Sequence, residues 1–373
     1  MNTWGFLRNI KSIYSDISSS AYDNNQEILS IKDFKKVFDE RLDIYVKNRI
    51  DNIIDITDND KIKSSLLYIK ELTSSGKRVR PYNAYLAYKL SQGNGDIYDA
   101  LVGIELFHVF ALVHDDIIDG SDERHKKLTI HSYYKSLLDN DKKNNHVSNS
   151  QAILLGDLIF SWSSDALISN TSVANLNDVR AIFNKMIDEV VIGQMIDVDL
   201  MVRDETTKKE LENKNLLKTA RYTFVNPLKI GCALAGKAGR YDEFFEMWGT
   251  AMGYAYQVQD DILDITGNPQ VTGKANFKDF EDGQHTFVTH YITENGNSYQ
   301  KEKLKSFWKR ELSSKDKKEL LIFLESTEAL NVGRKIVNDN IKQAEDSIIK
   351  YKLQEPYKTA FNNIVNLLKF RNE

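Results

Sequence analysis

Residues 101–118 and 247–265 are two apolar segments of helical length, and each of them runs into the same pattern of aspartates. The first pattern is DDIID at 115–119, and the second is DDILD at 260–264. Positions four apart share one face of an α-helix, so the first and last aspartate of each pattern project together. Carboxylates crowded near a helix C-terminus repel one another and meet the negative end of the helix dipole. The two patterns make sense if two buried helix ends hold divalent cations between them.

Magnesium is the cation that suits two such clusters best. Aspartate offers hard oxygen ligands, and no cysteine or cluster of histidines accompanies either pattern. Mg²⁺ binds such oxygens, keeps several waters and commonly shares a phosphate ligand. One isolated DDxxD pattern is more often a solvated helix end than a metal site. Its repetition after a second buried helix reverses that preference and indicates a metal site.

Helical periodicity extends over most of the chain. Apolar residues recur at helical spacing in 31–72, 82–90, 152–168 and 179–201, and no window alternates in the manner of a strand. Four prolines and 18 glycines are few for 373 residues, which favours long helices. We expect an all-α protein without a sheet, in which one helical domain at 31–373 follows a polar extension at 1–30.

Three features refine this expectation. Residues 101–113 are apolar on nearly every face, so we expect this helix in the middle of the bundle. Residues 139–150, DNDKKNNHVSNS, lack apolar periodicity and predict a loop. Residues 267–273 contain Pro269 and two glycines after a helix and predict a second break.

The composition excludes several other classes of protein. A net charge of −4 provides no basic field for nucleic acid. The single cysteine, Cys232, excludes an internal disulfide framework and fits a reducing compartment. The N-terminus has no continuous apolar segment, and residues 101–113 are too few to span a bilayer. We expect a cytoplasmic protein without stable membrane insertion.

Basic residues lie beside these segments. Residues 76–81, GKRVRP, place Lys77, Arg78 and Arg80 before a helix, and three cations in four positions fit a diphosphate. Residues 124–127, RHKK, follow the first aspartate pattern, where they can neutralise a leaving diphosphate. Either group alone is more often a solvated turn, so their meaning depends on the aspartates.

His108 lies about two helical turns before Asp115, on roughly the same face. A lone histidine on an apolar helix is more often a satisfied core residue than a ligand. The nearby aspartates make the two interpretations about equal.

Taken in order, the motifs between about residue 70 and residue 290 resemble those of the trans-isoprenyl (polyprenyl) diphosphate synthase family. Besides GKRVRP and the two aspartate patterns, the matching segments are LLGD at 154–157, GQMID at 193–197, KTARY at 218–222 and GNPQVTGK at 267–274. The histidine-containing segment ELFHVFALVHDDIID at 105–119 also matches. Several motifs in register make this resemblance more specific than either DDxxD pattern alone.

The resemblance implies a bundle of long helices around a central apolar cavity, usually in a homodimer. It implies an enzyme that condenses isopentenyl diphosphate with an allylic diphosphate. The metals and cations stabilise the departing diphosphate, and the double bond of isopentenyl diphosphate attacks the allylic cation. Water would quench that cation, so apolar walls matter.

The resemblance also assigns roles to residues. Mg²⁺, as three ions, is expected on Asp115, Asp116, Asp119, Asp260, Asp261 and Asp264. The diphosphate of isopentenyl diphosphate is expected on Lys77, Arg80 and His108, with Gln257 near the reacting substrates. The allylic substrate is expected on Arg124, His125, Lys218, Thr219 and Lys274. Catalysis is expected to depend on Lys218 and on the aspartates of both clusters.

The chain departs from the family in three places. The family usually has RRGxPT where this chain reads RHKKLT at 124–129, so His125 replaces an arginine. It usually has DLxxGKxT where this chain reads DFEDGQHT at 279–286, so Gln284 replaces a lysine. Extra sequence also lies within 139–150. The first two changes weaken contacts to diphosphate.

Product length is expected to depend on Phe110 and Ala111, about one turn before Asp115. In the resembling family, two aromatic residues there tend to stop the product at fifteen carbons. An aromatic residue only at the fifth position tends to allow twenty. We therefore expect geranylgeranyl diphosphate first and farnesyl diphosphate second.

Two alternatives stay open. A class I terpene cyclase shares the first aspartate pattern, but it usually carries NDxxSxxxE instead of the second. The nearest candidate, Asn338-Asp339, is followed by Lys342 where serine is needed, and cyclases lack the GKxxRP loop. A regulatory subunit without activity is supported only by His125 and Gln284.

Overall fold

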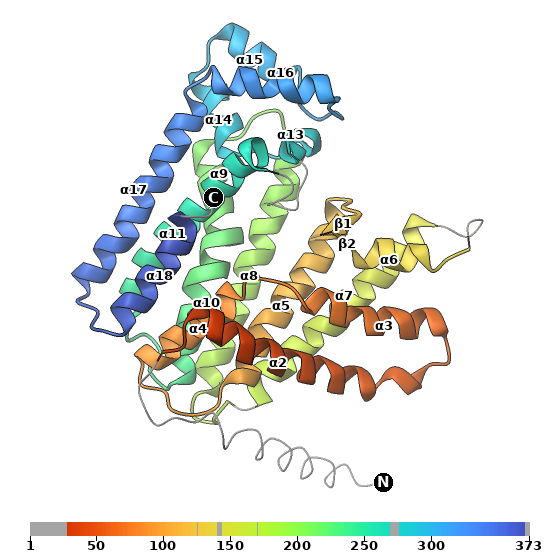
Figure 1. The fold of residues 1–373 in the computed structure, drawn as a ribbon, viewed down its shortest axis with the longest axis vertical. Helices are drawn as coiled ribbons and strands as arrows, with labels where there is room; N and C mark the ends of the chain where they lie inside the picture. The colour runs from red at the N-terminus through yellow and green to blue at the C-terminus, as the bar shows by residue number, and fades with distance from the viewer. Residues whose placement is uncertain (1–27, 125, 140–143, 170, 269–275, 370–373) are drawn as a thin grey trace.

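The structure is a computed structural model that describes residues 28–124, 126–139, 144–169, 171–268 and 276–369. It is an all-α protein, as the sequence predicts, with the helices arranged as a bundle (Figure 1). In chain order the elements are α2 (Ile31–Asp51), η1 (Ile54–Ile56), α3 (Asp60–Thr73), α4 (Val79–Leu90), α5 (Tyr98–Ile118), β1 (Glu123–Arg124), β2 (Lys127–Leu128), α6 (Ile130–Ser136), α7 (Asn145–Ser169), α8 (Leu176–Met201), α9 (Lys208–Asn215), the π-helix η3 (Leu216–Val225), α10 (Asn226–Leu234), α11 (Asp242–Thr266), α13 (Lys278–Asp282), α14 (Phe287–Asn295), α15 (Ser298–Lys305), α16 (Ser314–Glu325), α17 (Ala329–Lys350) and α18 (Tyr357–Lys369).

Helix α5 lies in the middle of the bundle, as its apolar sequence predicts. It packs along α7 and also contacts α2 and α4. Gly103 allows the close approach to α7, because a Cβ there would lie 2.6 Å from the backbone nitrogen of Leu167. Ser163 Oγ donates to the carbonyl oxygen of Gly103 at 2.7 Å and fixes the register of the two helices.

Helices α5, α8 and α11 run in the same direction, so their C-terminal ends lie toward one end of the bundle (Figure 1). Helices α13 to α16 lie at that same end, at the top of the view. Helix α17 packs along α11, and α18 packs on α17. This arrangement places the ends of α5 and α11, which carry the two aspartate patterns, on the same side of the molecule.

One expected helix is in fact two. The periodic segment 31–72 is divided into α2 and α3, with a turn of η1 between them. The division occurs because Asn59 begins a new helix: its side-chain oxygen accepts from the backbone nitrogens of Lys61 and Ile62 at 3.0 and 3.3 Å. An asparagine at this position satisfies donors that a helix N-terminus leaves open, which favours a fresh start over a continuous helix.

Two further expectations need correction. Strands β1 and β2 form an antiparallel hairpin of two residues each, so the prediction of no sheet is wrong at this one place. The predicted loop at 139–150 is shorter than expected, because α7 begins at Asn145. The Asn144 side chain accepts from the nitrogen of His146 at 2.8 Å and caps that start, although the first turn is polar.

Helix α7 is also the single helix of the described residues that is long and apolar enough to cross a membrane by length and composition. Of its most apolar window, 44% is buried inside the protein, where the helix packs along α5. The cytoplasmic location and the domain boundaries stay predictions. One continuous hydrophobic core includes residues from Phe34 to Leu368.

Candidate active site

The first aspartate cluster lies at the C-terminal end of α5 and is bound by an arginine of the β1–β2 hairpin. Asp116 is buried, and its Oδ1 accepts from Arg124 Nε at 2.8 Å and pairs with Arg124 Nη2 at 2.7 Å. The same Nη2 lies 3.6 Å from Asp115 Oδ2. Burial raises the pKa of Asp116, and the Arg124 guanidinium offsets this only in part. The hairpin thus places a cation against this cluster.

The other carboxylates of this cluster face α8 and η3. Asp115 Oδ1 accepts from Gln194 Nε2 of α8 at 3.0 Å and lies 3.6 Å from Lys218 Nζ of η3. Asp119 ends α5, and burial together with the neighbouring Asp115 raises its pKa to about 7. Carboxylates held this closely accumulate negative charge that a cation would relieve.

A buried aspartate of α8 holds two lysines beside the first cluster. Asp197 Oδ2 accepts from Lys218 Nζ at 2.6 Å, and Asp197 Oδ1 lies 3.0 Å from Lys214 Nζ. Lys214 also donates to the carbonyl oxygen of His285 at 2.8 Å. Burial alone would raise the pKa of Asp197, but the two ammonium groups outweigh it and hold the pKa below its usual range.

The π-helix η3 places Lys218 and Thr219 between α8 and α11. Two glycines let these helices approach it. A Cβ on Gly193 of α8 would lie 2.7 Å from the Lys218 nitrogen, and one on Gly253 of α11 would lie 2.2 Å from Ala220 Cα. π-Helical turns often occur at functional sites, and here the widened turn lies in the middle of the charged residues.

The second aspartate cluster, near the end of α11, is joined to η3 through a glutamine. Thr219 Oγ1 donates to Gln257 Oε1 at 2.7 Å, and Gln257 Nε2 donates to Asp261 Oδ1 at 2.9 Å. Asp261 Oδ2 accepts from the backbone nitrogen of Phe287 at 2.8 Å. Burial raises the pKa of Asp261 to about 6. Asp264 Oδ1 accepts from the backbone nitrogen of Lys278 at 3.1 Å. Asp260 is partly exposed.

A second basic group forms around Tyr222, the last residue of the KTARY segment. The Arg80 guanidinium lies over the Tyr222 ring, 4.2 Å from its centroid. The hydroxyl of Tyr222 lies 3.0 Å from His108 Nδ1. The buried Nε of Arg80 has no hydrogen-bond partner among the described residues. Lys77, three residues earlier, is exposed.

Arg78 does not join this group, so the prediction of three cations at one diphosphate is wrong. Its side chain is buried and pairs with Glu105 at 2.6 Å and with Asp39 at 2.7 Å. Arg78 has a φ of 54°, in the left-handed region, so the backbone at this residue departs from helical geometry. Glu105 is one turn before His108 on α5, so Arg78 ties the loop to that helix.

Sequence reasoning missed four polar residues of this site. Gln194 and Asp197 lie within the GQMID segment, and Tyr222 lies within KTARY, so the motifs contained them without assigning a role. Lys214 lies outside every motif. His125 and Lys274 are outside the described residues. Lys127 pairs with Glu71 at 2.8 Å instead of with the aspartates.

The chain-length residues lie on different sides of α5. The Phe110 ring packs against Phe160 of α7 at 5.0 Å and against His114 at 4.5 Å between ring centroids. Ala111, four residues before Asp115, shares the face of that aspartate. The aromatic contact with α7 places Phe160 next to the expected stop.

The aspartates fit a cation that arrives with its substrate. Among the described residues, no group of three or more histidine, cysteine, aspartate or glutamate side chains could hold a metal ion by itself. Mg²⁺ typically binds through one or two carboxylates together with waters and substrate phosphates. The buried oxygens of two separate clusters, with lysine and arginine between them, have the donor chemistry for such binding.

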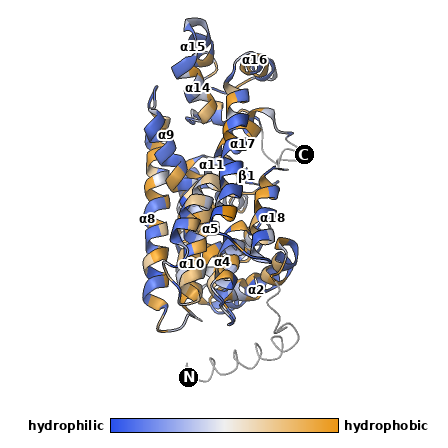
Figure 2. Cartoon of the chain, turned by 90° about the vertical axis from the view of Figure 1, so that its left-hand side faces the viewer, coloured by the Kyte–Doolittle hydropathy of each residue, from blue (hydrophilic) through white to orange (hydrophobic). Residues whose placement is uncertain are grey.

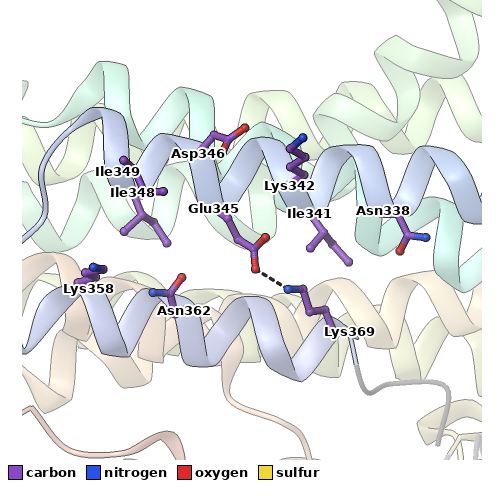
Figure 3. A pocket seen from close by; sticks show the side chains of 10 residues that line it. All are labelled: Asn338, Ile341, Lys342, Glu345, Asp346, Ile348, Ile349, Lys358, Asn362 and Lys369. Atoms are coloured by element: carbon purple, nitrogen blue, oxygen red, sulfur yellow. Dashed lines mark hydrogen bonds and ion pairs between the residues drawn. The ribbon is translucent and has the colours of Figure 1, made fainter.

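A pocket of about 550 Å³ lies elsewhere, between α17 and α18 (Figure 3). Asn338 and Lys342 line it, and these are the residues of the nearest cyclase-like pattern. An ion pair between Glu345 and Lys369 crosses the pocket. The residues that a cyclase would need beside Asp115 therefore lie on α17, facing α18.

Comparisons with known proteins agree with this geometry. The family model of polyprenyl synthetase matches residues 60–323. The chain is 25% identical to a short chain isoprenyl diphosphate synthase of Methanothermobacter thermautotrophicus, over 86% of this chain and 93% of that protein. It is 28% identical to a geranylgeranyl diphosphate synthase of Methanosarcina mazei, over 68% of this chain and 74% of that protein.

A solved structure shares the fold. The crystal structure of geranylgeranyl pyrophosphate synthase from Corynebacterium glutamicum, complexed with isoprenyl diphosphate and magnesium, superposes with a TM-score of 0.84 at 23% identity. The match covers 92% of this chain and 100% of that one. Similarity at this level of identity shows that the two proteins have the same arrangement of helices.

Proposed function

The chain belongs to the polyprenyl synthetase family, and on that premise we propose that it condenses isopentenyl diphosphate with an allylic diphosphate to a short-chain isoprenyl diphosphate. One observation carries the proposal. The pair Lys218–Thr219 of η3 contacts both aspartate clusters, with Lys218 beside Asp115 and Thr219 joined through Gln257 to Asp261. A diphosphate bound there would meet cations and carboxylates from three helices at once.

The cations of the site pair with carboxylates of the protein. Arg124 pairs with Asp116, and Lys218 pairs with Asp197. When a diphosphate binds, these cations can bind phosphate oxygens, and the allylic group can also contact Thr219. His125 and Lys274 are proposed for the same substrate on the family resemblance alone. The pairing compensates the charge of the buried carboxylates.

Mg²⁺, as three ions, is proposed on Asp115, Asp116, Asp119, Asp260, Asp261 and Asp264. When bound, it supplies positive charge that stabilises the departing diphosphate. The chain itself positions that charge, because the ends of α5 and α11 are fixed by close packing against neighbouring helices. Two solved structures of similar fold are complexes with isoprenyl diphosphate and with magnesium or calcium, which supports a divalent cation.

The isopentenyl substrate is proposed at the group around Tyr222. Arg80 and His108 are both held by this tyrosine, and Lys77 is exposed nearby in the sequence. The Arg80 Nε, buried and without a partner among the described residues, is a donor that a phosphate oxygen would satisfy. A donor left buried costs free energy, so a substrate that pairs with it gains affinity.

The product is proposed to be geranylgeranyl diphosphate, with farnesyl diphosphate as the second candidate. Phe110 is aromatic at the fifth position before the first cluster, and Ala111 at the fourth is small. The names of the relatives support a short chain, since they include short-chain isoprenyl and geranylgeranyl diphosphate synthases. Phe110 packed on Phe160 is a candidate barrier to further growth.

A homodimer is proposed on the exposed apolar face of α8. Val191, Ile192, Met195 and Val198 of α8 and Val202, the residue that caps its C-terminus, recur at helical spacing and are between 40% and 81% exposed. The helix lies at an edge of the molecule (Figure 2). A second copy of the chain would cover this face, because a closed symmetric pair buries the same surface on both subunits.

Turnover decides between the proposed function and its alternatives. The purified chain is incubated with Mg²⁺, isopentenyl diphosphate and geranyl diphosphate, which is shorter than either candidate product, and the products are separated by chromatography. A prenyl synthase forms a longer diphosphate. A cyclase would instead release a hydrocarbon or an alcohol from the allylic substrate alone. A regulatory subunit would form no product, and that result would overturn the proposal.

A further inference from the structure

Lys214 is a buried lysine in the last turn of α9, and its side chain is only 8% exposed. Its ammonium contacts Asp197 Oδ1 at 3.0 Å and donates to the His285 carbonyl at 2.8 Å. Burying an ammonium is costly unless its partners compensate it fully. A lysine placed here therefore requires an explanation beyond the packing of α9.

The positive charge of Lys214 is only partly neutralised by its neighbours. Asp197 is a single carboxylate shared by two ammonium groups, those of Lys214 and Lys218. Lys218 also faces Asp115 of the first cluster, whereas the charge of Lys214 acts on Asp261 of the second, where it offsets part of the rise in pKa that burial causes. Lys214 thus lies between the diphosphate cation Lys218 and the second aspartate cluster.

The His285 carbonyl, the second partner of Lys214, lies next to a position where this chain departs from the family. His285 follows Gln284, which occupies the position where the resembling sequences usually carry lysine. Lys214 reaches this turn from α9, and its ammonium donates to the carbonyl of His285, the residue that follows Gln284. Two other lysines of this region bind elsewhere: Lys278 pairs with Asp282 at 2.6 Å, and Lys309 donates to the Arg203 carbonyl at 2.9 Å.

We propose that Lys214 binds the allylic diphosphate beside Lys218 and supplies the ammonium that this chain lacks at position 284. The inference rests on the proposed function. An ammonium has three N–H donors. One N–H of Lys214 is donated to the His285 carbonyl, whereas Asp197 Oδ1, 3.0 Å from the ammonium, forms an ion pair with it but accepts no hydrogen bond within the described part of the chain. The ammonium therefore has a donor to offer a phosphate oxygen.

A double-mutant cycle of Lys214→Met and Gln284→Lys tests the inference. In Lys214→Met we expect the KM for the allylic diphosphate to rise about 10- to 100-fold, the worth of one charge-assisted hydrogen bond. The KM for isopentenyl diphosphate should change less than about threefold. Gln284→Lys should change little in the native background and should recover most of the loss in the Lys214→Met background, because it adds an ammonium on the residue next to His285.

Two controls separate binding from folding. Lys209→Met removes an exposed lysine of the same helix and should leave both KM values unchanged. Binding of inorganic pyrophosphate, measured by calorimetry, should weaken in Lys214→Met. This measurement does not depend on turnover, so it also reads out the inference if the native chain makes no product. Lys214→Gln replaces Lys214→Met if that variant unfolds.

The inference is overturned by either of two results. One is an unchanged allylic KM and unchanged pyrophosphate binding in a folded Lys214 variant. The other is a rise in KM that affects both substrates alike, is accompanied by a lower melting temperature and is not reversed by Gln284→Lys. A lysine that only joins α9 to the turn at residue 285 would give this second result. Absence of turnover in the native chain would instead contradict the proposed function.

Discussion

At the scale of the residue, the site is a set of acidic and basic side chains that neutralise one another. Asp116 binds Arg124, and Asp197 binds two lysines. Removal of one partner would leave a buried charge uncompensated, which costs more than the pair contributes. The effect of each substitution therefore depends on whether its residue compensates a buried charge or takes part in the reaction.

Asp115→Ala and Asp260→Ala should each lower kcat by about 100-fold or more, because each removes a carboxylate from charge stabilisation at the leaving group. Asp339→Ala, on α17, is the matched control and should leave kcat unchanged. Steady-state kinetics at saturating Mg²⁺ measures both. Near-normal turnover in either cluster variant would contradict the two-cluster site, and a loss in Asp339→Ala would favour the cyclase-like pattern.

Tyr222→Phe should raise the KM for isopentenyl diphosphate about 2- to 10-fold, the worth of one neutral hydrogen bond, and leave the allylic KM unchanged. The substitution removes the hydroxyl beside His108 and keeps the ring beneath Arg80. Tyr222→Leu removes both contacts and should raise the same KM further. Equal effects on the two substrates would show that Tyr222 supports the fold and not the isopentenyl group.

At the scale of the element, the π-helix η3 and the two glycines beside it determine where the reactive groups lie. Gly193 and Gly253 let α8 and α11 close on η3, and Lys218 and Thr219 then lie between the two aspartate clusters. The central helix α5 carries three kinds of group along its length: Glu105 anchors the basic loop, His108 contacts Tyr222, and Asp115 faces η3. A helix that positions several groups makes their spacing rigid.

The same helix carries the prediction about product length. Phe110→Ala should lengthen the product, because it removes the ring that packs on Phe160. Ala111→Phe should shorten it, because it adds a ring on the face of Asp115. Chromatography of the products from one allylic substrate measures both shifts. Phe160→Ala is the companion variant, and an unchanged distribution in all three would locate the stop on another element.

At the scale of the whole molecule, the proposal of a homodimer rests on the apolar stripe of α8. Ile192→Glu combined with Met195→Glu should convert a dimer to a monomer, because two buried carboxylates would oppose their copies across the interface. Ile349→Glu, at an exposed residue of α17, is the control and should not change the mass. Light scattering measures the mass, and a monomeric native chain would contradict the homodimer.

Local pattern was enough for much of this protein. The 3.6-residue period predicted α4, α5, α8 and α11, since burial along one helix repeats with its own turn. The spacing of the aspartates predicted two paired clusters at helix ends, and their order with the basic motifs indicated the family. These features depend on residues near one another in the sequence, so the sequence by itself determined them.

Only the tertiary structure decided which partner each charged residue has. Arg78 and Arg80 look alike in the sequence, yet Arg78 pairs with Glu105 and Asp39 inside the fold while Arg80 lies over Tyr222. Lys214 belongs to no motif, and its position became visible only beside Asp197 and His285. Periodicity reports which face of a helix is buried, but the choice of an ionic partner depends on contacts between residues far apart in the chain.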